Sequence, residues 1–424
     1  MVRQIRCDGW PHRSHSTLRV LDPACGDGRL LTAIAREFDR TELVGCDIDA
    51  QVADAITDDR IELVVADGLD FCQNVVASFD LVIANPPFLS QMASLTSRRG
   101  SSKFGGGPYA NVAMEFCHAA LDTLKPGGRM TIVLPQSSLA SRDSSDLRAS
   151  VSAKARLIDS HWSPVAHFDA SVTVAVLTFE RREVDVAPDG SPWTMPVVDA
   201  LGIPPLPSLR TSGSLGDIAD AHSNFRDEYY ALVPAVSDDE VGPPLITSGL
   251  IDPGQCHWGT RPVRFAKTTF FSPRVNLDML NGRFPKWAER LLRPKVLVAA
   301  QTRIIEAVAD REGLWLPGVP VISVVPPADV SVDAIAAYLT SPIPSLIAWH
   351  TRGGTGLSSK SVRLSPQFLL DLPLPATLPS ARSLTALAAG DLRSTGLAIC
   401  EDFGLTTAAS NNLVEWWLTT GKLA

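Results

Sequence analysis

Seven short apolar runs between residues 18 and 179 constrain the fold of this chain more than any other feature. They occupy residues 18–21, 43–47, 61–65, 79–84, 129–134, 155–160 and 172–179. Stretches with helical spacing of apolar residues separate several of them, notably 30–38 after the first run and 110–124 after the fourth. Strands that alternate with helices form right-handed βαβ units, so the pattern predicts an α/β domain with a mostly parallel, Rossmann-like sheet.

Composition narrows the class of protein. The chain has 424 residues, of which 45% are hydrophobic and 20% charged, as expected of a soluble globular protein with two or three domains. No apolar run approaches the roughly 18–20 residues of a membrane span, and residues 1–16 lack the apolar core of a signal peptide. The seven cysteines include no C-x-x-C pair, so we expect neither a bound metal nor a disulfide framework. These features predict a cytoplasmic location.

Shifts in composition predict the domain boundaries. Residues 1–183 hold the strand and helix alternation, and residues 184–216 are rich in Pro, Asp, Ser and Gly, as in a linker. Residues 217–378, with short strand-like pieces and many prolines, are expected to form a second, α+β domain. Residues 379–424 are expected to be a helical tail.

Polar residues follow three of the apolar runs, at the strand ends where parallel sheets bind ligands. The first run continues into DPACGDG at residues 22–28, where glycines let a ligand approach the backbone at the start of a helix. The second ends at Asp47, which suits the two hydroxyls of a ribose, and the third at Asp67, which could accept an adenine amine. Each has a structural alternative: a tight turn for the glycines, a helix N-cap for Asp47, although Asp49 is better placed, and a turn beside Gly68 for Asp67.

The fourth apolar run ends in Asn85-Pro86-Pro87-Phe88, which is more than a strand terminator. The two prolines end the hydrogen-bonded ladder and stiffen the exit loop, but they explain neither the amide before them nor the ring after them. The Asn85 side-chain oxygen beside the Pro86 carbonyl offers two acceptors to one NH2 group, and Phe88 offers a face for a planar ring. The segment therefore predicts a grip for a planar amine.

In this order, DPACGDG, CDID, ADG and NPPF resemble the S-adenosylmethionine (SAM) and catalytic motifs of class I methyltransferases that act on an amino group. The resemblance continues through YANVAMEFCHAALDTLKPGGRMTIVLPQSSL and VAHFDASVTVAVLTF. It implies SAM as cofactor, held by Asp22, Pro23, Ala24, Cys25, Gly26, Gly28, Asp47, Ile48, Asp67, Gly68 and Asn85. It implies Asn85, Pro86, Pro87 and Phe88 as the catalytic segment, with Phe168 as a second aromatic residue that faces the target base.

The second half resembles the target-recognition domain of the Taq-type, gamma-class adenine-N6 DNA methyltransferases. The resembling segments include PPLITSGLIDPG, RPKVLVAAQTRI and LTSPIPSLIAWHTRGGTGLSSKSVRLSPQFLLDLPLP. Residues 241–370 hold 14 Lys and Arg against 8 Asp and Glu, although the whole chain has a net charge of −8. Basic residues mixed with aromatic ones suit a phosphate backbone and unstacked bases. The residues that we expect to contact DNA are Arg261, Arg264, Lys267, Arg303, Lys360 and Arg363.

The resemblance spans residues 18–375 and implies a site-specific enzyme that methylates N6 of an adenine flipped out of double-stranded DNA, with SAM as the methyl donor. The expected setting is a restriction–modification or related defence system, with any nuclease on another chain. Two alternatives stay open: a DNA-binding subunit with a degenerate methyltransferase fold and no activity alone, and a methyltransferase for protein glutamine or RNA. The large second domain disfavours a methyltransferase for protein glutamine or RNA. Enzymes that methylate cytosine N4 usually have Ser at the position of Asn85, so cytosine N4 is disfavoured as the target.

The resemblance fails before the first strand. Gamma-class enzymes normally carry a longer segment there, with a Thr-Pro motif that closes over the methionine end of SAM, and residues 1–17 contain no such motif. A shortened start, a partner chain that supplies the motif, or weak SAM binding in an inactive chain would each account for this. Besides DNA, the expected partners are therefore a restriction endonuclease or a second subunit.

Overall fold

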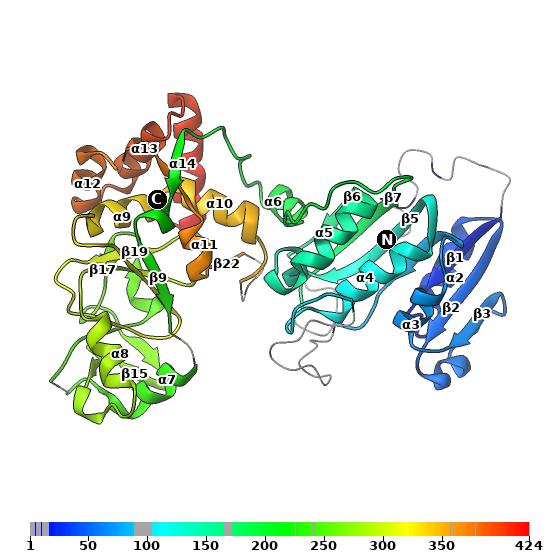
Figure 1. The fold of residues 1–424 in the computed structure, drawn as a ribbon, viewed down its shortest axis with the longest axis horizontal. Helices are drawn as coiled ribbons and strands as arrows, with labels where there is room; N and C mark the ends of the chain where they lie inside the picture. The colour runs from blue at the N-terminus through cyan, green and yellow to red at the C-terminus, as the bar shows by residue number, and fades with distance from the viewer. Residues whose placement is uncertain are drawn as a thin grey trace. The chain divides into compact units, whose positions relative to one another are not determined.

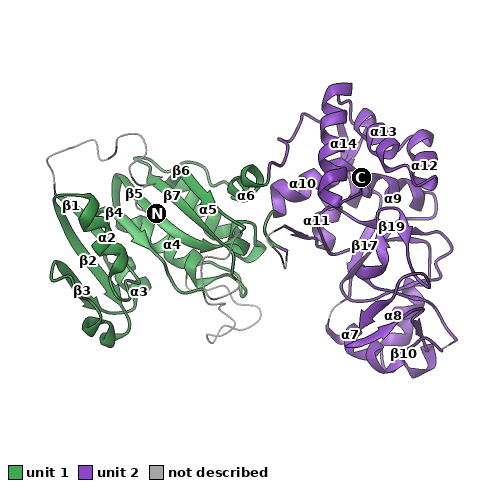
Figure 2. Cartoon of the chain, turned by 180° about the vertical axis from the view of Figure 1, so that it is seen from behind, with its two compact units in different colours: residues 1–201, 353–355 green, residues 202–352, 356–424 purple. Residues whose placement is uncertain are grey.

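The chain forms two compact units, seen in a computed structural model (Figure 2). The structure describes residues 5, 10, 17–88, 104–164, 172–224, 226–239, 241–356, 358, 360–377 and 379–423. Unit 1 comprises Met1–Leu201 with Gly353–Thr355, and unit 2 comprises Gly202–Arg352 with Gly356–Ala424. Over the described ranges, no helix is both long and apolar enough to cross a membrane.

Unit 1 is built on a seven-stranded sheet with the strand order β3-β2-β1-β4-β5-β7-β6 (Figure 1). The strands are β1 (Leu18–Asp22), β2 (Thr41–Asp47), β3 (Ile61–Val65), β4 (Phe79–Ala84), β5 (Leu124–Pro135), β6 (Ala155–Trp162) and β7 (Val174–Arg181). Strands β3, β2, β1, β4 and β5 pair in parallel, whereas β7 runs antiparallel to β5 and to β6. The seven predicted strands and the mostly parallel sheet are confirmed.

Helices cover both faces of this sheet. They are α2 (Arg29–Glu37), α3 (Gly68–Asn74), α4 (Val112–Thr123) and α5 (Ser145–Lys154), with short 3-10 turns η2 (Ala50–Asp54), η4 (Gln136–Leu139) and η5 (Arg142–Ser144). Right-handed crossovers that run in opposite directions along a sheet put their helices on opposite faces, so α2 lies opposite α3 and α4. Leu31 and Ile34 of α2 pack on Val20, Leu43 and Ile83 of the strands. Burial of this apolar face explains why the predicted helix at 30–38 forms.

The predicted linker at 184–216 contains regular structure. Helix α6 (Met195–Ala200) buries Pro196, Val197 and Val198, and it packs against β6. Strand β8 (Thr211–Ser214) belongs to unit 2 and pairs with β23 (Pro373–Pro375). Unit 1 therefore extends to Leu201, beyond the boundary expected at 183, because apolar side chains in a Pro-rich stretch are buried on the sheet.

Unit 2 contains a four-stranded antiparallel sheet in the order β19-β17-β21-β9. Its strands are β9 (Asp220–Ser223), β17 (Lys295–Ala299), β19 (Ala307–Asp310) and β21 (Val321–Val325). Lys295 and Asp310 form a buried ion pair between β17 and β19. Burial lowers the pKa of the Lys295 ammonium, and Asp310 opposes that change. The paired charges link the two strands at the end where β17 begins and β19 ends.

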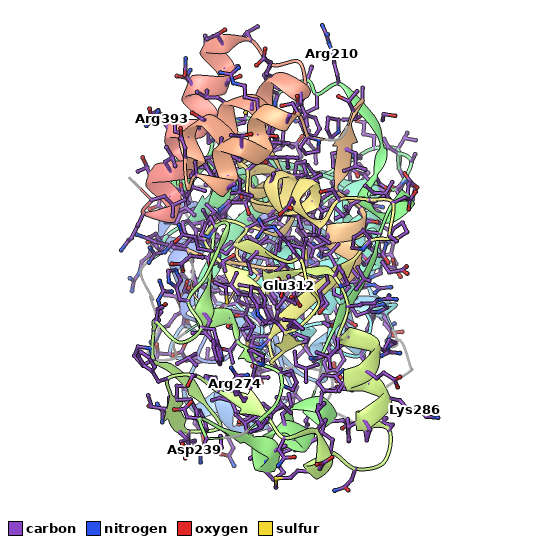
Figure 3. All side chains as sticks on the ribbon, turned by 90° about the vertical axis from the view of Figure 1, so that its left-hand side faces the viewer. Arg210, Asp239, Arg274, Lys286, Glu312 and Arg393 are labelled. Carbon is purple, nitrogen blue, oxygen red and sulfur yellow. The ribbon has the colours of Figure 1, made fainter. Side chains whose placement is uncertain are left out.

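Smaller elements surround this sheet. A small lobe contains α7 (Arg226–Leu232), β10 (Val236–Ser237), β14 (Val263–Phe265), β15 (Thr268–Phe270), β16 (Arg274–Val275) and α8 (Phe284–Leu291). Figure 3 shows Arg274 and Lys286 in this lobe, with Arg210 and Arg393 at the other end of unit 2. Short strands elsewhere are β11 (Leu245–Ile246), β12 (Ile251–Asp252), β13 (Gln255–Cys256), β18 (Gln301–Thr302), β20 (Leu316–Pro317) and β22 (Val362–Arg363).

Helices occupy most of the C-terminal tail and pack on earlier helices of unit 2. The earlier helices are α9 (Val332–Leu339), α10 (Pro342–Arg352) and α11 (Pro366–Leu370). The helices of the tail are α12 (Ala381–Ala388), α13 (Leu392–Asp402) and α14 (Thr407–Gly421). Helices α12 and α13 contact α9, and α13 and α14 contact α10. The Phe403 ring stacks on Tyr338, with centroids 6.1 Å apart. The tail is therefore part of the core of unit 2.

Candidate active site

The segment DPACGDG leaves β1 as a tight loop and leads into α2. Gly26 and Gly28 have φ values of +48° and +73°, in the left-handed region that favours glycine. A Cβ at Gly28 would lie 2.9 Å from the Ile61 side chain, whereas a Cβ at Gly26 would meet nothing within 4 Å. The loop is thus tightly packed at its helix end and leaves open space beside the Gly26 backbone.

Asp22 is the buried acid of this loop, with 1% of its surface exposed. Its Oδ1 accepts a hydrogen bond from the Ala24 N–H at 3.1 Å, while its buried Oδ2 has no hydrogen-bond partner among the described residues. Burial raises the pKa of Asp22 from 3.8 to about 7; the Ala24 N–H opposes the rise and Asp47 adds to it. A buried carboxyl oxygen without a donor costs free energy, so this atom is prepared to receive a donor or a cation.

Asp47 binds the backbone of the same loop. Its Oδ2 accepts from the Gly26 N–H at 2.9 Å, and its Oδ1 accepts from the Asp49 N–H at 3.0 Å. Asp49 caps η2 through Gln51, as expected. Ile48 is 73% exposed beside it and offers an apolar surface at the same edge of the sheet. The carboxylate that we predicted to bind a ribose therefore also fixes the glycine loop.

Asp67 and Gly68 bring the third strand end close to the first. Asp67 is the N-cap of α3, and its Oδ1 accepts from the Leu69 N–H at 2.8 Å. The structural alternative stated for Asp67 was a turn beside Gly68, whereas the bond makes it a helix cap; Oδ2 is left without a hydrogen bond in the described ranges. A Cβ at Gly68 would lie 1.9 Å from the Pro23 carbonyl oxygen, so only glycine lets α3 approach the DPACGDG loop.

Asn85-Pro86-Pro87-Phe88 follows β4 directly. β4 lies beside β1, with Leu21 opposite Val82, at the point where the strand order of the sheet reverses. Such a switch point is where open α/β sheets bind ligands. Asn85 is exposed, Pro86 is buried and Phe88 is half-buried. Within the described ranges, no hydrogen bond engages the Asn85 side chain, so its amide oxygen is available. Phe168 lies outside the described residues.

Two features of this edge were not among the predicted site residues. Gln136 follows β5, is 4% exposed, and has a buried Nε2 with no hydrogen-bond partner in the part of the chain that the structure describes. Gly353–Thr355 cluster with unit 1, and a Cβ at Gly354 would lie 2.3 Å from Gln136 Nε2. The signal in the sequence was the glycine pair at 353–354.

The residues predicted to contact DNA lie in unit 2 and differ in their surroundings. Arg264, Lys267, Arg303, Lys360 and Arg363 are exposed. The Arg261 guanidinium forms two hydrogen bonds with the Asp252 carboxylate, at 2.9 and 2.5 Å, and His257 Nε2 lies 2.8 Å from the same group.

The Lys267 backbone lies at the tip of the β14–β15 hairpin. Ala266 and Lys267 both have positive φ, at +50° and +68°, which is uncommon for residues other than glycine. A two-residue hairpin turn of this kind fits the strand twist but normally uses Asn or Gly. The hairpin thus presents an exposed ammonium on a strained turn.

Comparison with known proteins identifies the fold of unit 1. Residues 11–152 match the family model Methyltransferase small domain. Ribosomal RNA small subunit methyltransferase C of Salmonella arizonae is 31% identical over 126 residues, which cover 28% of this chain and 32% of that protein. The tRNA1(Val) (adenine(37)-N6)-methyltransferase of Pasteurella multocida is 26% identical over 141 residues, which cover 31% of this chain and 58% of that protein. This chain thus spans less than two thirds of either relative.

One solved structure is similar to this chain at lower identity. The Type I restriction enzyme EcoKI M protein is 23% identical, with a TM-score of 0.32, over 39% of this chain and 40% of that chain. The family match and the strand order establish the class I SAM methyltransferase fold, with an additional C-terminal domain of strands and helices. The predicted fold class is confirmed.

S-adenosylmethionine is the cofactor of this fold, and the residues at the strand ends fit it. The unpartnered Asp22 Oδ2 suits the ammonium of the methionine part, because a cation would compensate the buried carboxylate. The open space at Gly26 admits a ligand to the backbone, and Ile48 offers an apolar face to a purine ring. Asp47 and Asp67 add carboxylate oxygens for hydroxyl and amine donors.

Proposed function

We propose that this chain is a SAM-dependent DNA methyltransferase that modifies N6 of an adenine flipped out of a duplex, in a restriction–modification or related defence setting. The observation that carries the proposal is the position of Asn85 and Pro86 at the exit of β4, beside the strand that ends in Asp22. This arrangement sets two acceptors for an amine next to the predicted cofactor loop.

The residues at the exit of β4 have a defined part in this reaction. An adenine amine is a poor nucleophile because its lone pair is delocalised into the ring. Asn85 Oδ1 and the Pro86 carbonyl each accept one N–H of that amine, which turns the nitrogen lone pair out of the ring plane. The cofactor supplies a methyl group bonded to a sulfonium. The main contribution of the protein is therefore position, which in ideal cases lowers a barrier by about 7–11 kcal/mol.

Base flipping costs a few kcal/mol, and aromatic side chains offset part of it. Phe88 and Phe168 are the proposed stacking partners, each worth about 1–3 kcal/mol per stacked base. Unit 2 supplies duplex binding in this proposal, because residues 241–370 carry an excess of Lys and Arg. Arg261, Arg264, Lys267, Arg303, Lys360 and Arg363 are the proposed contacts with DNA.

RNA is the second candidate substrate, and the comparisons favour it specifically. The two relatives described above are named as rRNA and tRNA methyltransferases, and one of them as an adenine-N6 enzyme. The family model matches residues 11–152, within unit 1, and leaves unit 2 without a counterpart. We nevertheless place DNA first, because the sequence of unit 2 resembles the target-recognition domain of DNA methyltransferases.

One experiment tests the proposal. The full chain is incubated with SAM carrying a labelled methyl group and with unmethylated duplex DNA of mixed sequence, and in parallel with total RNA. Digestion to nucleosides then identifies the product. Labelled N6-methyldeoxyadenosine supports the proposal, and label in RNA alone overturns it in favour of the second candidate. Absence of transfer to either substrate, with SAM bound, identifies a subunit without activity of its own.

A further inference from the structure

Unit 2 contains a polar cleft where the chain passes from β17 to β19. Its volume is about 430 Å³. The residues that line it, called here the β17–β19 cleft, are Gln301, Thr302, Arg303, Glu306, Ser358, Ser361 and Gly421. Arg303 belongs to the predicted DNA contacts, whereas Gln301, Thr302 and Glu306 were not predicted from the sequence.

The backbone that carries these side chains is fixed from beneath. β18 pairs antiparallel with β22. The Trp349 indole N–H donates to the Arg303 carbonyl at 2.8 Å, and the Ile305 N–H donates to Ser345 Oγ at 3.0 Å. Trp349 and Ile305 are each no more than 1% exposed. A backbone held in this way presents its side chains in a defined arrangement, as a recognition site requires.

Two residues that line the cleft each have a side-chain atom without a hydrogen-bond partner among the described residues. These atoms are Gln301 Oε1 and Thr302 Oγ1, and both are buried. Thr302 is 8% exposed. A buried polar group left without a partner costs about 1–3 kcal/mol, and native proteins rarely retain one without a reason. These atoms therefore indicate that the cleft receives a ligand with hydrogen-bond donors.

Glu306 adds a carboxyl group to the same cleft. Burial raises the pKa of Glu306 from 4.5 to about 7; Asp252 adds to the rise, and Arg261 and Arg303 oppose it. No hydrogen bond satisfies this carboxyl in the described part of the chain. Glu306 is thus a half-buried hydrogen-bond acceptor, and Arg261 and Arg303 do not fully offset the effect of burial on its pKa.

The mixture of groups limits what the cleft can bind. A phosphate would be repelled by the Glu306 carboxylate, and a metal ion would be repelled by the Arg303 guanidinium. The edge of a base pair presents both amine donors and acceptors, so it can pair with the Glu306 carboxylate and the Arg303 guanidinium at once. Carboxylates accept hydrogen bonds from exocyclic amines in the major groove, and Arg donates to guanine.

We propose that the β17–β19 cleft reads one base pair of the target site, and this inference rests on the proposed function. Glu306 accepts a hydrogen bond from the exocyclic amine of one base, Gln301 Oε1 and Thr302 Oγ1 accept further donors, and Arg303 contacts an acceptor on the same or the neighbouring pair. The amine belongs to cytosine or adenine. The identity of the base at the affected position distinguishes these two sources.

The test uses the full chain and a library of DNA duplexes whose bases vary around the methylated adenine. Methylated molecules are sequenced for the wild type, for Glu306→Gln and for a control, Glu312→Gln. Glu312, labelled in Figure 3, is exposed on the loop after β19 and is not one of the residues that line the cleft. Gln replaces one acceptor oxygen with a donor, so Glu306→Gln is expected to lose roughly five- to 150-fold selectivity at one position, equivalent to about 1–3 kcal/mol. Glu312→Gln should keep the wild-type preference.

A second variant separates recognition from stability. Thr302→Val keeps the shape of the side chain and removes the unpartnered hydroxyl, so thermal stability should hold or rise while selectivity falls. The matched control is Thr340→Val, because the buried Thr340 hydroxyl donates to the Ala307 carbonyl at 3.1 Å and its loss should lower stability. If Thr302→Val is destabilised like the control, the hydroxyl is structural.

The two hypotheses fail in different ways. A wild-type chain that methylates no DNA overturns the proposed function, and the base-reading inference with it. A wild-type chain with a defined DNA site, together with Glu306→Gln and Thr302→Val variants of unchanged selectivity, overturns the inference alone and leaves the methyltransferase proposal intact.

Discussion

The candidate residues of unit 1 follow strands of five to seven residues in one parallel sheet, whereas those of unit 2 lie on and beside strands of two to five residues. In unit 1, at least one carboxylate oxygen of each of Asp22, Asp47 and Asp67 accepts a hydrogen bond from a backbone N–H group. In the β17–β19 cleft, Gln301 Oε1 and Thr302 Oγ1 make no such bond to the described residues.

This difference has a consequence for mutations. Where one carboxylate both folds a loop and binds a ligand, its replacement should change stability and binding together. Where a polar atom has no partner within the protein, its replacement should change binding and leave stability unchanged or improved. We therefore expect substitutions in the cofactor loops to change stability and binding together, and substitutions in the cleft of unit 2 to alter selectivity alone.

The largest effect is expected at Asn85, which is exposed and has no hydrogen bond in the described ranges although it belongs to unit 1. Asn85→Ala removes one of the two acceptors for the target amine, so the rate of methyl transfer should fall by a factor of about 100 to 1,000 or more, by analogy with loss of one preorganised polar contact to a reacting group. SAM affinity and thermal stability should change little. The measurement is single-turnover methyl transfer together with SAM titration.

The control for Asn85 is Asn74→Ala, at the exposed end of α3, whose side chain donates to the Asp70 carbonyl. It should retain full activity. Retention of normal turnover by Asn85→Ala would remove Asn85 from the proposed mechanism, and a collapse in stability would show that Asn85 is a structural residue like its neighbours in unit 1.

The second prediction concerns pH and Asp22. Because the pKa of Asp22 in the folded, SAM-free protein is about 7 and its ordinary value is 3.8, the folded state holds a proton that the unfolded state has lost between these values. Its contribution to the free energy of unfolding is therefore complete below about pH 4 and is lost as the pH rises through 7. Asp22→Asn should not show this loss, and at pH 8 it should be more stable than the wild type by up to roughly 4 kcal/mol.

Denaturation at pH 5 and pH 8, with and without SAM, measures this effect. Asp22→Asn should also bind SAM at least tenfold more weakly, because the ammonium loses its carboxylate. Asp27→Asn, an exposed position in the same loop, is the matched control and should keep the wild-type pH profile. An identical pH dependence in Asp22→Asn and the wild type would contradict the assignment of a buried, proton-binding carboxyl at this site.

The sequence predicted unit 1 far better than unit 2, and the reason is physical. In a parallel sheet, strand ends that are distant in the chain meet at one edge, so Asp22, Asp47, Asp67 and Asn85 could be grouped without knowledge of their contacts. Neither the helix cap formed by Asp67 nor the bond from the Gly26 N–H to Asp47 was foreseen: the stated alternative for Asp67 was a turn beside Gly68, and the Asp47 bond depends on how the two loops approach.

Unit 2 could not be predicted to the same depth because its pairing is long-range and its strands are short. Nothing in the local pattern places Thr302 opposite Val362, or tells that Trp349 fixes the Arg303 backbone. Charge counts found the exposed Arg and Lys residues, but they could not show that Arg261 is paired with Asp252. Buried polar atoms without partners are a property of packing, and composition carries no signal for them.

A third prediction tests whether Phe88 acts as a stacking surface or only as packing. Phe88→Ala should lower the rate of methyl transfer by roughly five- to 150-fold, since stacking of one base contributes about 1–3 kcal/mol. Duplex affinity should fall less, because phosphate contacts in unit 2 remain. Phe88→Tyr keeps the ring and should stay close to the wild type, and Phe88→Leu keeps most of the apolar volume without it. Equal rates for Phe88→Leu and the wild type would show that the half-buried ring serves packing alone.

The smallest expected effect lies at the tip of the β14–β15 hairpin and gives the sharpest contrast with the cofactor loops. Ala266 and Lys267 have positive φ, and a left-handed conformation costs a residue with a side chain roughly 1–2 kcal/mol. Ala266→Gly and Lys267→Gly should therefore each raise stability slightly, by up to about 1 kcal/mol.

Only Lys267→Gly removes a charge, so only that variant should reduce the slope of log affinity against log salt concentration, by about 1. Titrations of duplex DNA at several salt concentrations measure the slope, and Ala266→Gly is the matched control. Equal slopes in the two variants would show that the strained turn holds Lys267 away from the phosphates, and that unit 2 binds DNA through other residues.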